Sequence, residues 1–258
     1  IEAGADRAAL QKLLPPGAAR NAVDCAMWDL EAKRSGRRAS ATAGFPRLSP
    51  LVTAYTLSVG TPDEMRAAAL RAADRPLLKV KLAGEGDDAR LAAVREGAPH
   101  ATLIIDANEA WREETLVAQL AACARVGVAL IEQPLPAGQD EMLAKIAHPI
   151  PICADESAHD AASLVGLKGR YDAVNIKLDK TGGLTEALIM AQAARAQGFE
   201  IMAGCMVGTS LAMAPAMLIG QMAAFVDLDG PLLLAKDRTP GLLYEGSTMA
   251  PPPPALWG

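Results

Sequence analysis

The stretch Leu103-Ile104-Ile105-Asp106 sets the pattern of this chain, because it is a short apolar run that ends in a carboxylate. The stretches Leu130-Ile131-Glu132 and Ile152-Cys153-Ala154-Asp155 repeat that pattern. A lysine ends the corresponding run before them, Lys79-Val80-Lys81, and the run after them, Asn175-Ile176-Lys177. The steps from Lys81 through the three acids to Lys177 are 25, 26, 23 and 22 residues, about one strand, one helix and two loops each. The sequence therefore predicts a βα repeat that brings five ionisable groups to one end of one sheet.

Eight strand-like runs alternate with alanine-rich amphipathic segments from residue 51 onward. The predicted strands are Leu51–Val59, Leu77–Leu82, Thr102–Asp106, Ala129–Glu132, Ile150–Asp155, Ala173–Leu178, Glu200–Cys205 and Phe225–Leu228. They are almost continuously apolar, which is typical of parallel strands that helices cover. Eight such strands, each followed by a helix, favour an α/β fold of the (β/α)8, TIM-like barrel type over a doubly wound sheet.

The first 50 residues differ from the rest of the chain. From Ala18 to Lys33, apolar side chains recur at helical spacing, and Gly36 follows as a normal helix stop. We therefore predict three parts: helices of a separate small domain over 1–50, the barrel over 51–230, and a C-terminal segment over 231–258. We expect that last segment, which is rich in proline and leucine, to pack back toward the first part; a flexible linker is the alternative.

Composition limits the classes of function. A formal net charge of −5 without a basic block argues against nucleic acid and anionic membranes as partners. Apolar stretches stop short of the roughly 20 residues that a membrane span needs, and we expect no secretion leader. The four cysteines form no CxxC pair, so we expect reduced thiols in a cytoplasmic protein. The expected partner is a small molecule, and a homo-oligomer stays open.

The three carboxylates predict a metal site. Acids at the ends of successive barrel strands converge, and they repel one another unless a cation neutralises them. An all-oxygen ligand set without Cys or His selects a hard ion, of which Mg2+ is the usual one. Helix caps or arginine pairs would explain one such acid but not three in register. We therefore expect Asp106, Glu132 and Asp155 to bind Mg2+.

Lys81 and Lys177 are the candidate acid/base groups. A nearby divalent cation and a second lysine disfavour the charged form of a lysine, which suits it to act as a general base. One neutral amine and one ammonium suit the removal and return of a proton at one carbon, provided that a carboxylate bound to Mg2+ acidifies that carbon. Lys79 lies on the same face of its strand as Lys81 and could bind the substrate carboxylate.

The last predicted strand carries a second acidic pair. Asp227 and Asp229 alternate with Leu228, so both face one side of the strand. Because the metal acids are already accounted for, this pair points to a cationic group on the substrate, such as an α-ammonium. A helix cap or a turn before Gly230-Pro231 is an equally good alternative from the sequence.

Taken together, these motifs resemble the enolase superfamily, muconate-lactonizing subgroup, and within it the dipeptide epimerases of the L-Ala-D/L-Glu epimerase type. The matching stretches are Tyr55-Thr56, Lys79-Val80-Lys81, Asp106-Ala107-Asn108, Ile131-Glu132-Gln133-Pro134, Ala154-Asp155-Glu156-Ser157, Asn175-Ile176-Lys177, Gly204-Cys205-Met206 and Asp227-Leu228-Asp229. They span nearly all of the barrel. The final Asp-x-Asp favours dipeptide epimerases over muconate cycloisomerases or o-succinylbenzoate synthases.

The resemblance implies a Mg2+-dependent, two-base 1,1-proton transfer through an enediolate at the Cα of the second residue of a dipeptide. Lys81 and Lys177 would be the two bases, and the three acids would hold the metal. The implied substrate contacts are Thr56, Lys79, Cys205, Met206, Val207, Asp227 and Asp229. Gly208 stands where relatives often carry a glutamate, which predicts a different side-chain preference. Residues 1–50 would be the remnant of an N-terminal α+β capping domain whose preceding part is absent.

Other functions stay open. A cycloisomerase, an o-succinylbenzoate synthase or an N-acylamino acid racemase would share the metal and the lysines. A Schiff-base aldolase also places a lysine on a barrel strand, but it needs no three metal acids. A non-catalytic barrel that binds a small molecule needs no paired bases, so it is the least favoured of these functions.

Overall fold

The computed structural model describes residues 4–258, which form two compact units. Unit 1 contains the described residues up to Thr53 together with Ala158–Leu164 and Ile176–Gly258. Unit 2 contains Ala54–Ser157 and Val165–Asn175. The division into three parts over 1–50, 51–230 and 231–258 stays a prediction.

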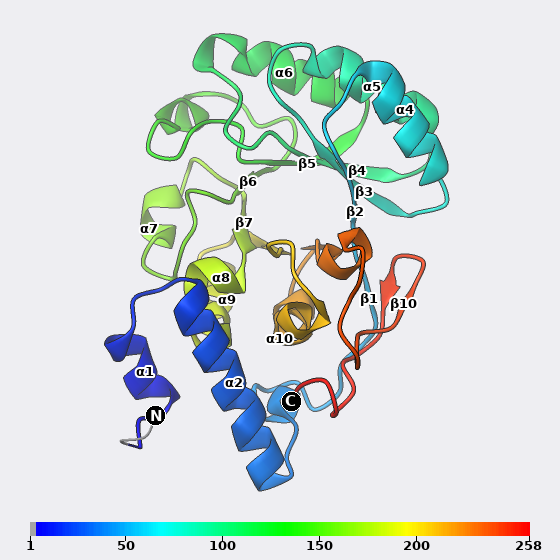
Figure 1. The fold of residues 1–258 in the computed structure, drawn as a ribbon. Coiled ribbons are helices and arrows are strands. Elements are labelled where there is room, and N and C mark those ends of the chain that lie inside the picture. The colour runs from blue at the N-terminus through cyan, green and yellow to red at the C-terminus, as the bar shows by residue number, and fades with distance from the viewer. Residues whose placement is uncertain (1–3) are drawn as a thin grey trace. The chain divides into compact units, whose positions relative to one another are not determined.

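Unit 2 is built on six strands that pair in chain order, each parallel to the next (Figure 1). They are β2 (Tyr55–Leu57), β3 (Leu77–Lys81), β4 (Thr102–Asp106), β5 (Val128–Glu132), β6 (Ile152–Ala154) and β7 (Ala173–Ile176), the last of which enters unit 1 at its final residue. Because the strands are parallel, their carboxyl ends lie at one edge of the sheet. The side chains of Leu78, Val80, Leu103, Ile105 and Leu130 are fully buried, as expected for strands that helices cover.

The long helices of unit 2 line the outer side of β3, β4 and β5 (Figure 1). They are α4 (Pro62–Arg71), α5 (Asp87–Gly97) and α6 (Glu113–Arg125), and the 3-10 helix η1 (Glu141–Lys145) follows β5. A capping box between Thr61 and Glu64 begins α4. At the end of α5, a Cβ on Gly97 would come within 2.5 Å of the Arg66 carbonyl oxygen, so only glycine allows α4 and α5 to pack this closely.

Unit 1 combines helices, a parallel strand pair and a small antiparallel sheet. Its helices are α1 (Arg7–Leu13), α2 (Ala18–Ser35), α3 (Ala39–Thr42), α8 (Leu178–Thr181), α9 (Leu184–Ala196), α10 (Ser210–Gly220) and η2 (Gly230–Leu233). The short helix α7 (Leu164–Leu167) begins in unit 1 and continues in unit 2. Strands β8 (Glu200–Ala203) and β9 (Phe225–Val226) are parallel, and β1 (Leu51–Val52), β11 (Thr248–Met249) and β10 (Tyr244–Glu245) form the antiparallel sheet in that order.

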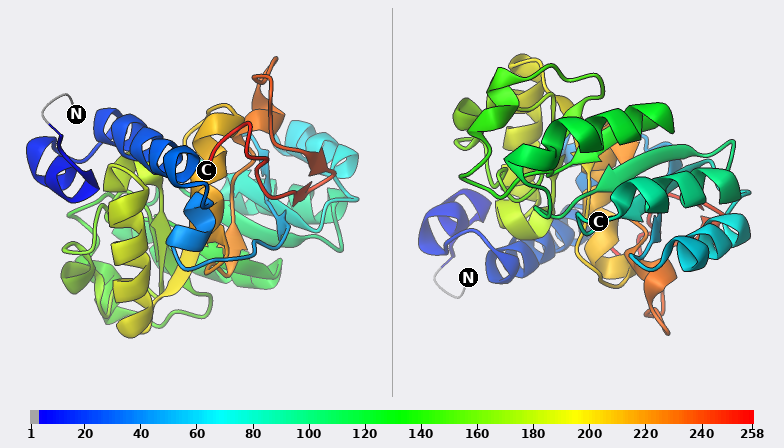
Figure 2. Two further views of the ribbon diagram at one scale, coloured as in Figure 1. Left: turned by 90° about the horizontal axis from the view of Figure 1, so that it is seen from below. Right: turned by 90° about the horizontal axis from the view of Figure 1, so that it is seen from above.

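Helix α2 packs against α8 and α9 in unit 1 (Figure 2). Trp28 Nε1 donates a hydrogen bond to Thr185 Oγ1 at 3.0 Å, and the buried Asp24 accepts one from the Thr185 backbone N–H at 2.9 Å. The C-terminal segment ends on the same helix, since Trp257 Nε1 donates to the Cys25 carbonyl at 2.9 Å. In unit 1 the described N-terminal helices and the C-terminal segment therefore share one packed region.

The stretch predicted as one strand, Leu51–Val59, is two strands in the structure. The Thr53 backbone N–H donates to the Ser247 carbonyl at 2.8 Å, and its Oγ1 accepts from the Leu228 N–H at 2.8 Å. These bonds attach β1 to the antiparallel sheet, whereas β2 pairs with β3. The other seven predicted strands agree with the observed ones, which extend beyond the predicted ranges by at most one residue. No helix among residues 4–258 has both the length and the apolar character needed to cross a membrane.

Candidate active site

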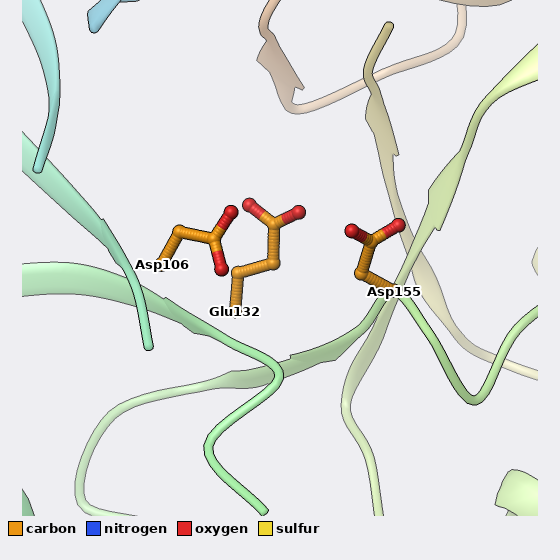
Figure 3. A group of neighbouring side chains, drawn as sticks. All are labelled: Asp106, Glu132 and Asp155. Atoms are coloured by element: carbon orange, nitrogen blue, oxygen red, sulfur yellow. The ribbon is translucent and has the colours of Figure 1, made fainter. Parts of the chain in front are cut away.

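Three carboxylates meet at the carboxyl edge of the unit 2 sheet. Asp106 ends β4, Glu132 ends β5 beside it in register, and Asp155 directly follows β6. All three side chains are buried. Figure 3 shows the three carboxyl groups directed into one space, and one oxygen from each lies within 4.8 Å of the others.

Two lysines of β3 reach the same carboxylates. Lys79 Nζ lies 2.7 Å from Glu132 Oε2 and 3.2 Å from Asp106 Oδ2. Lys81 Nζ lies 2.6 Å from Asp106 Oδ2 and donates to Asn108 Oδ1 at 3.0 Å. The side chain of Lys79 is only 2% exposed, whereas that of Lys81 is 31% exposed. Lys79 is therefore part of the buried charge cluster, and Lys81 is the amine with access to solvent.

The cluster keeps Asp106 ionised. Burial raises the pKa of its carboxyl, but the nearby ammonium groups of Lys79 and Lys81 lower it more, so that the net pKa lies below the usual value. The backbone N–H of Asn108 also donates to Asp106 Oδ1 at 2.9 Å. From β7, two strands away from β5, Asn175 Nδ2 donates to Glu132 Oε1 at 2.7 Å. These charge-assisted bonds hold the carboxylates in place.

The donor set fits a divalent metal ion. It consists of carboxylate oxygens from three neighbouring strand ends, and hard cations prefer oxygen ligands. The ammonium of Lys79, close to two of the three acids, is direct evidence that this space attracts positive charge. Three close carboxylates would otherwise repel one another.

Three residues other than glycine adopt a positive φ beside these strand ends. They are Asn108 at φ 43°, Glu109 at φ 64° and Gln133 at φ 33°. Such conformations cost of order 1–3 kcal/mol each and gather at functional sites. The sequence motifs include Asn108, Gln133 and Asn175 but assign no role to them; their positions next to the predicted acids and Lys177 were the available signal.

The remaining predicted residues lie at strand ends as well. In unit 2, Thr56 of β2 is in register with Lys79. In unit 1, Lys177 follows β7, the stretch Cys205–Val207 follows β8, and Asp227 follows β9. The N–H of Gly204 donates to the Ile176 carbonyl at 3.1 Å, and that of Asp227 donates to the Ala203 carbonyl at 2.8 Å, so these unit 1 strand ends are neighbours.

Asp229 and Asp227 are both buried in unit 1. Asp229 occupies the N-cap position of η2 but makes no side-chain capping hydrogen bond there. A side-chain helix cap therefore does not explain Asp229, whereas a turn does remain an alternative, since the Asp229 carbonyl accepts from the Leu232 N–H at 2.8 Å. Met206 and Val207 are instead 49% and 69% exposed, which is unusual for large apolar side chains beside a strand end.

Comparison with known proteins agrees with this arrangement. Two curated relatives are each 51% identical to the chain over 95% of its length. One is the L-Ala-D/L-Glu epimerase of Escherichia coli (strain K12), of which 77% is covered, and the other is the N-acetyl-D-glutamate racemase of Pseudoalteromonas sp., of which 78% is covered. Both names describe isomerases that act on amino acid derivatives.

A solved structure from Agrobacterium tumefaciens is similar over the whole chain. It is an enolase family member with homology to dipeptide epimerases, and it holds sodium and L-Ala-L-Glu with an ordered loop. It matches with a TM-score of 0.98 at 59% identity, covering 100% of this chain and 79% of that one. The predicted barrel fold class and the resemblance to dipeptide epimerases are thus confirmed. Since residues 64–252 also match the family model for the Enolase C-terminal domain-like fold, the chain belongs to that family of the enolase superfamily.

Proposed function

We propose that this protein is a Mg2+-dependent dipeptide epimerase of the L-Ala-D/L-Glu type. The observation that carries the proposal is the buried cluster of Asp106, Glu132 and Asp155 with Lys79 and Lys81 bound to it. An isomerase that moves a Cα proton needs a base and a means to stabilise the resulting negative charge, and this cluster offers both. The names of the relatives support the same reaction class.

In this proposal Lys81 removes or returns the Cα proton on one face of the substrate, and Lys177 does so on the other. Asp106 and Asn108 each accept one hydrogen bond from Lys81 Nζ, which leaves the third position of the amine for the proton in transit. Mg2+ held by the three acids would neutralise the negative charge that develops on the substrate carboxylate. Lys79 compensates the charge of Asp106 and Glu132 from within the protein.

We assign substrate recognition to Thr56 and to the strand ends of unit 1. The buried pair Asp227 and Asp229 would bind the α-ammonium of the dipeptide, because two carboxylates on one strand end match one cation. The other contacts that we propose are Cys205, Met206 and Val207. The cytoplasmic location, the absence of nucleic acid and membrane partners, and a homo-oligomer stay predictions.

A second candidate is an N-acylamino acid racemase. One of the two relatives at 51% identity is named N-acetyl-D-glutamate racemase, so close similarity alone does not separate the two activities. The two substrates share an acylated glutamate and differ at the amino end, where only the dipeptide carries an ammonium group. Asp227 and Asp229 therefore discriminate between the candidates.

The test is hydrogen exchange at Cα in D2O with Mg2+, followed by proton NMR, with L-Ala-L-Glu and N-acetyl-L-glutamate compared side by side. We expect exchange with inversion on the dipeptide, at a higher kcat/KM than on the N-acetyl compound. The double variant Asp227→Asn/Asp229→Asn should raise KM for the dipeptide and leave KM for N-acetyl-L-glutamate unchanged.

Two results would redirect the assignment. A preference for N-acetyl-L-glutamate, together with no effect of the double variant on either substrate, would favour the racemase. No exchange on any dipeptide would favour an elimination or cycloisomerisation within the same subgroup.

A further inference from the structure

The side chain of Gln133 is fully buried in unit 2, and its amide makes hydrogen bonds at both ends. Its Oε1 accepts from the backbone N–H of Asp155 at 2.8 Å and from that of Ser157 at 3.2 Å. Its Nε2 lies within hydrogen-bond distance of three acceptors, Ser157 Oγ at 3.0 Å, Tyr171 OH at 2.9 Å and the Leu135 carbonyl at 2.9 Å. Since a backbone N–H can only donate, the oxygen of the amide must face Asp155, and the nitrogen must face the two hydroxyls.

A buried carboxylate sets the direction of these bonds. Asp140 Oδ2 accepts from Ser157 Oγ at 2.8 Å and from Tyr171 OH at 2.6 Å. Because a carboxylate can only accept, both hydroxyls donate their proton to Asp140. Their oxygen lone pairs are then free to accept from Gln133 Nε2. Arg170 balances the charge of Asp140 across the other oxygen, at 2.5 Å. From the Asp155 N–H through Gln133 and the two hydroxyls to Asp140, every hydrogen bond therefore donates in the same direction, and each bond reinforces the next.

This chain ends on the candidate metal site. Gln133 directly follows Glu132, and its side chain binds the N–H of Asp155 on the neighbouring strand end. Its backbone N–H donates to the Cys153 carbonyl at 2.9 Å, so main chain and side chain both connect β5 to β6. Gln133 also holds a φ of 33°, a costly conformation that persists only where surrounding contacts enforce it.

We propose that Gln133, oriented by Asp140 through Ser157 and Tyr171, is the positioning residue that sets Asp155 against Glu132 for metal binding. This inference rests on the metal site of the proposed function. Gln133 contacts neither substrate nor metal in this role. It holds the backbone of Asp155 in a fixed position relative to that of Glu132. Partners of this kind, one step removed from the metal, change its affinity about 10- to 100-fold when they are lost.

The experiment measures Mn2+ affinity of the full chain by the loss of the free-ion signal in electron paramagnetic resonance. Gln133→Met keeps the side-chain volume and removes all of its hydrogen bonds, so we expect Mn2+ to bind about 10- to 100-fold more weakly, with an altered bound-ion signal. Tyr171→Phe removes one of the two hydroxyls that orient the amide, so its loss of affinity should be smaller. It also serves as the second variant if Gln133→Met does not fold.

A matched control separates positioning from general destabilisation. Val94→Ala removes buried methyl groups from α5 and lowers stability, and it should leave Mn2+ affinity unchanged. If the unaltered chain binds Mn2+ and both network variants bind it equally well, the positioning role is overturned while the metal site stands. If the unaltered chain shows no saturable binding, the metal site fails and this inference fails with it.

Discussion

The strand ends of unit 2 and those of unit 1 carry different kinds of side chain. In unit 2, Lys79, Asp106 and Glu132 are buried and bind one another within 2.7–3.2 Å. In unit 1, the residues after β8 include Met206 and Val207, whose side chains are largely exposed. Groups that move protons and hold metal need fixed positions, whereas groups that select a side chain need a free surface. Unit 2 thus holds the proposed metal site and one proposed base, Lys81, whereas unit 1 carries the second proposed base, Lys177, together with the exposed side chains that we propose for recognition.

The largest expected effect is loss of a base. Lys81→Ala should lower the rate of epimerisation about 10²- to 10⁴-fold, because general acid–base catalysis by one group contributes that much. NMR in D2O, with each dipeptide diastereomer as the substrate, measures this loss. Exchange of the Cα proton by Lys177 should persist for one of the two diastereomers.

In Lys177→Ala, the other dipeptide diastereomer, the one that no longer exchanges in Lys81→Ala, should still exchange its Cα proton. Lys168 is an exposed lysine of unit 2, and the control variant Lys168→Ala should leave the rate of epimerisation unchanged. Full epimerisation by either Lys81→Ala or Lys177→Ala would eliminate the two-base scheme.

The next effect separates metal binding from catalysis. Asp155→Asn removes one of three carboxylates, so Mg2+ affinity measured by calorimetry should fall by more than the roughly 10- to 100-fold expected for an indirect partner. Asp63→Asn, on the exposed first turn of α4, keeps the affinity of the parent chain. Equal Mg2+ affinity for Asp155→Asn and the parent chain would show that unit 2 does not hold the ion through this set.

A smaller effect tests recognition in unit 1. Val207→Ala should change the ratios of kcat/KM values across a panel of L-Ala-X dipeptides by at most about 15-fold, because it removes two CH2 equivalents that contribute about 0.8 kcal/mol each when buried. Mg2+ affinity should not change. A uniform loss on every dipeptide would contradict a role in selecting the side chain.

The smallest effect concerns Asp237, which lies in the loop after η2 and accepts a hydrogen bond from the backbone N–H of Ser210, the first residue of α10. Burial raises the pKa of Asp237, but hydrogen bonds from Ser210 and from the Arg238 backbone lower it more, so the net pKa lies below the usual value. A carboxyl with a depressed folded-state pKa stabilises the fold above its unfolded pKa, and this contribution disappears as the pH falls through the folded value.

Urea unfolding of the parent chain and of Asp237→Asn should therefore differ near neutral pH and converge only as the pH falls below the ordinary aspartate pKa of about 4. A difference that does not depend on pH would mean that the hydrogen bonds, and not the charge of Asp237, stabilise this loop. No change in the metal affinity of unit 2 is expected from this variant.

The sequence by itself determined which residues end the strands. Parallel strands buried on both faces must be apolar, so a single charge at the end of such a run marks a position at the edge of the sheet. That reasoning identified Lys81, Asp106, Glu132, Asp155 and Lys177. The structure brings the first four together in unit 2, where Lys79 joins them, and places Lys177 in unit 1. It depends only on local composition and on the βα period, both of which a linear chain displays.

Only the tertiary structure decided how those residues are held. The break at Thr53 depends on bonds to Ser247 and Leu228, which lie far from it along the chain. The orientation of Gln133 depends on Ser157 and also on Asp140 and Tyr171, which none of the sequence motifs includes. Such contacts arise from strand register and loop conformation, which the whole fold imposes. The candidate catalytic and metal-binding residues could therefore be predicted from the sequence, whereas the hydrogen-bond network that positions them could not.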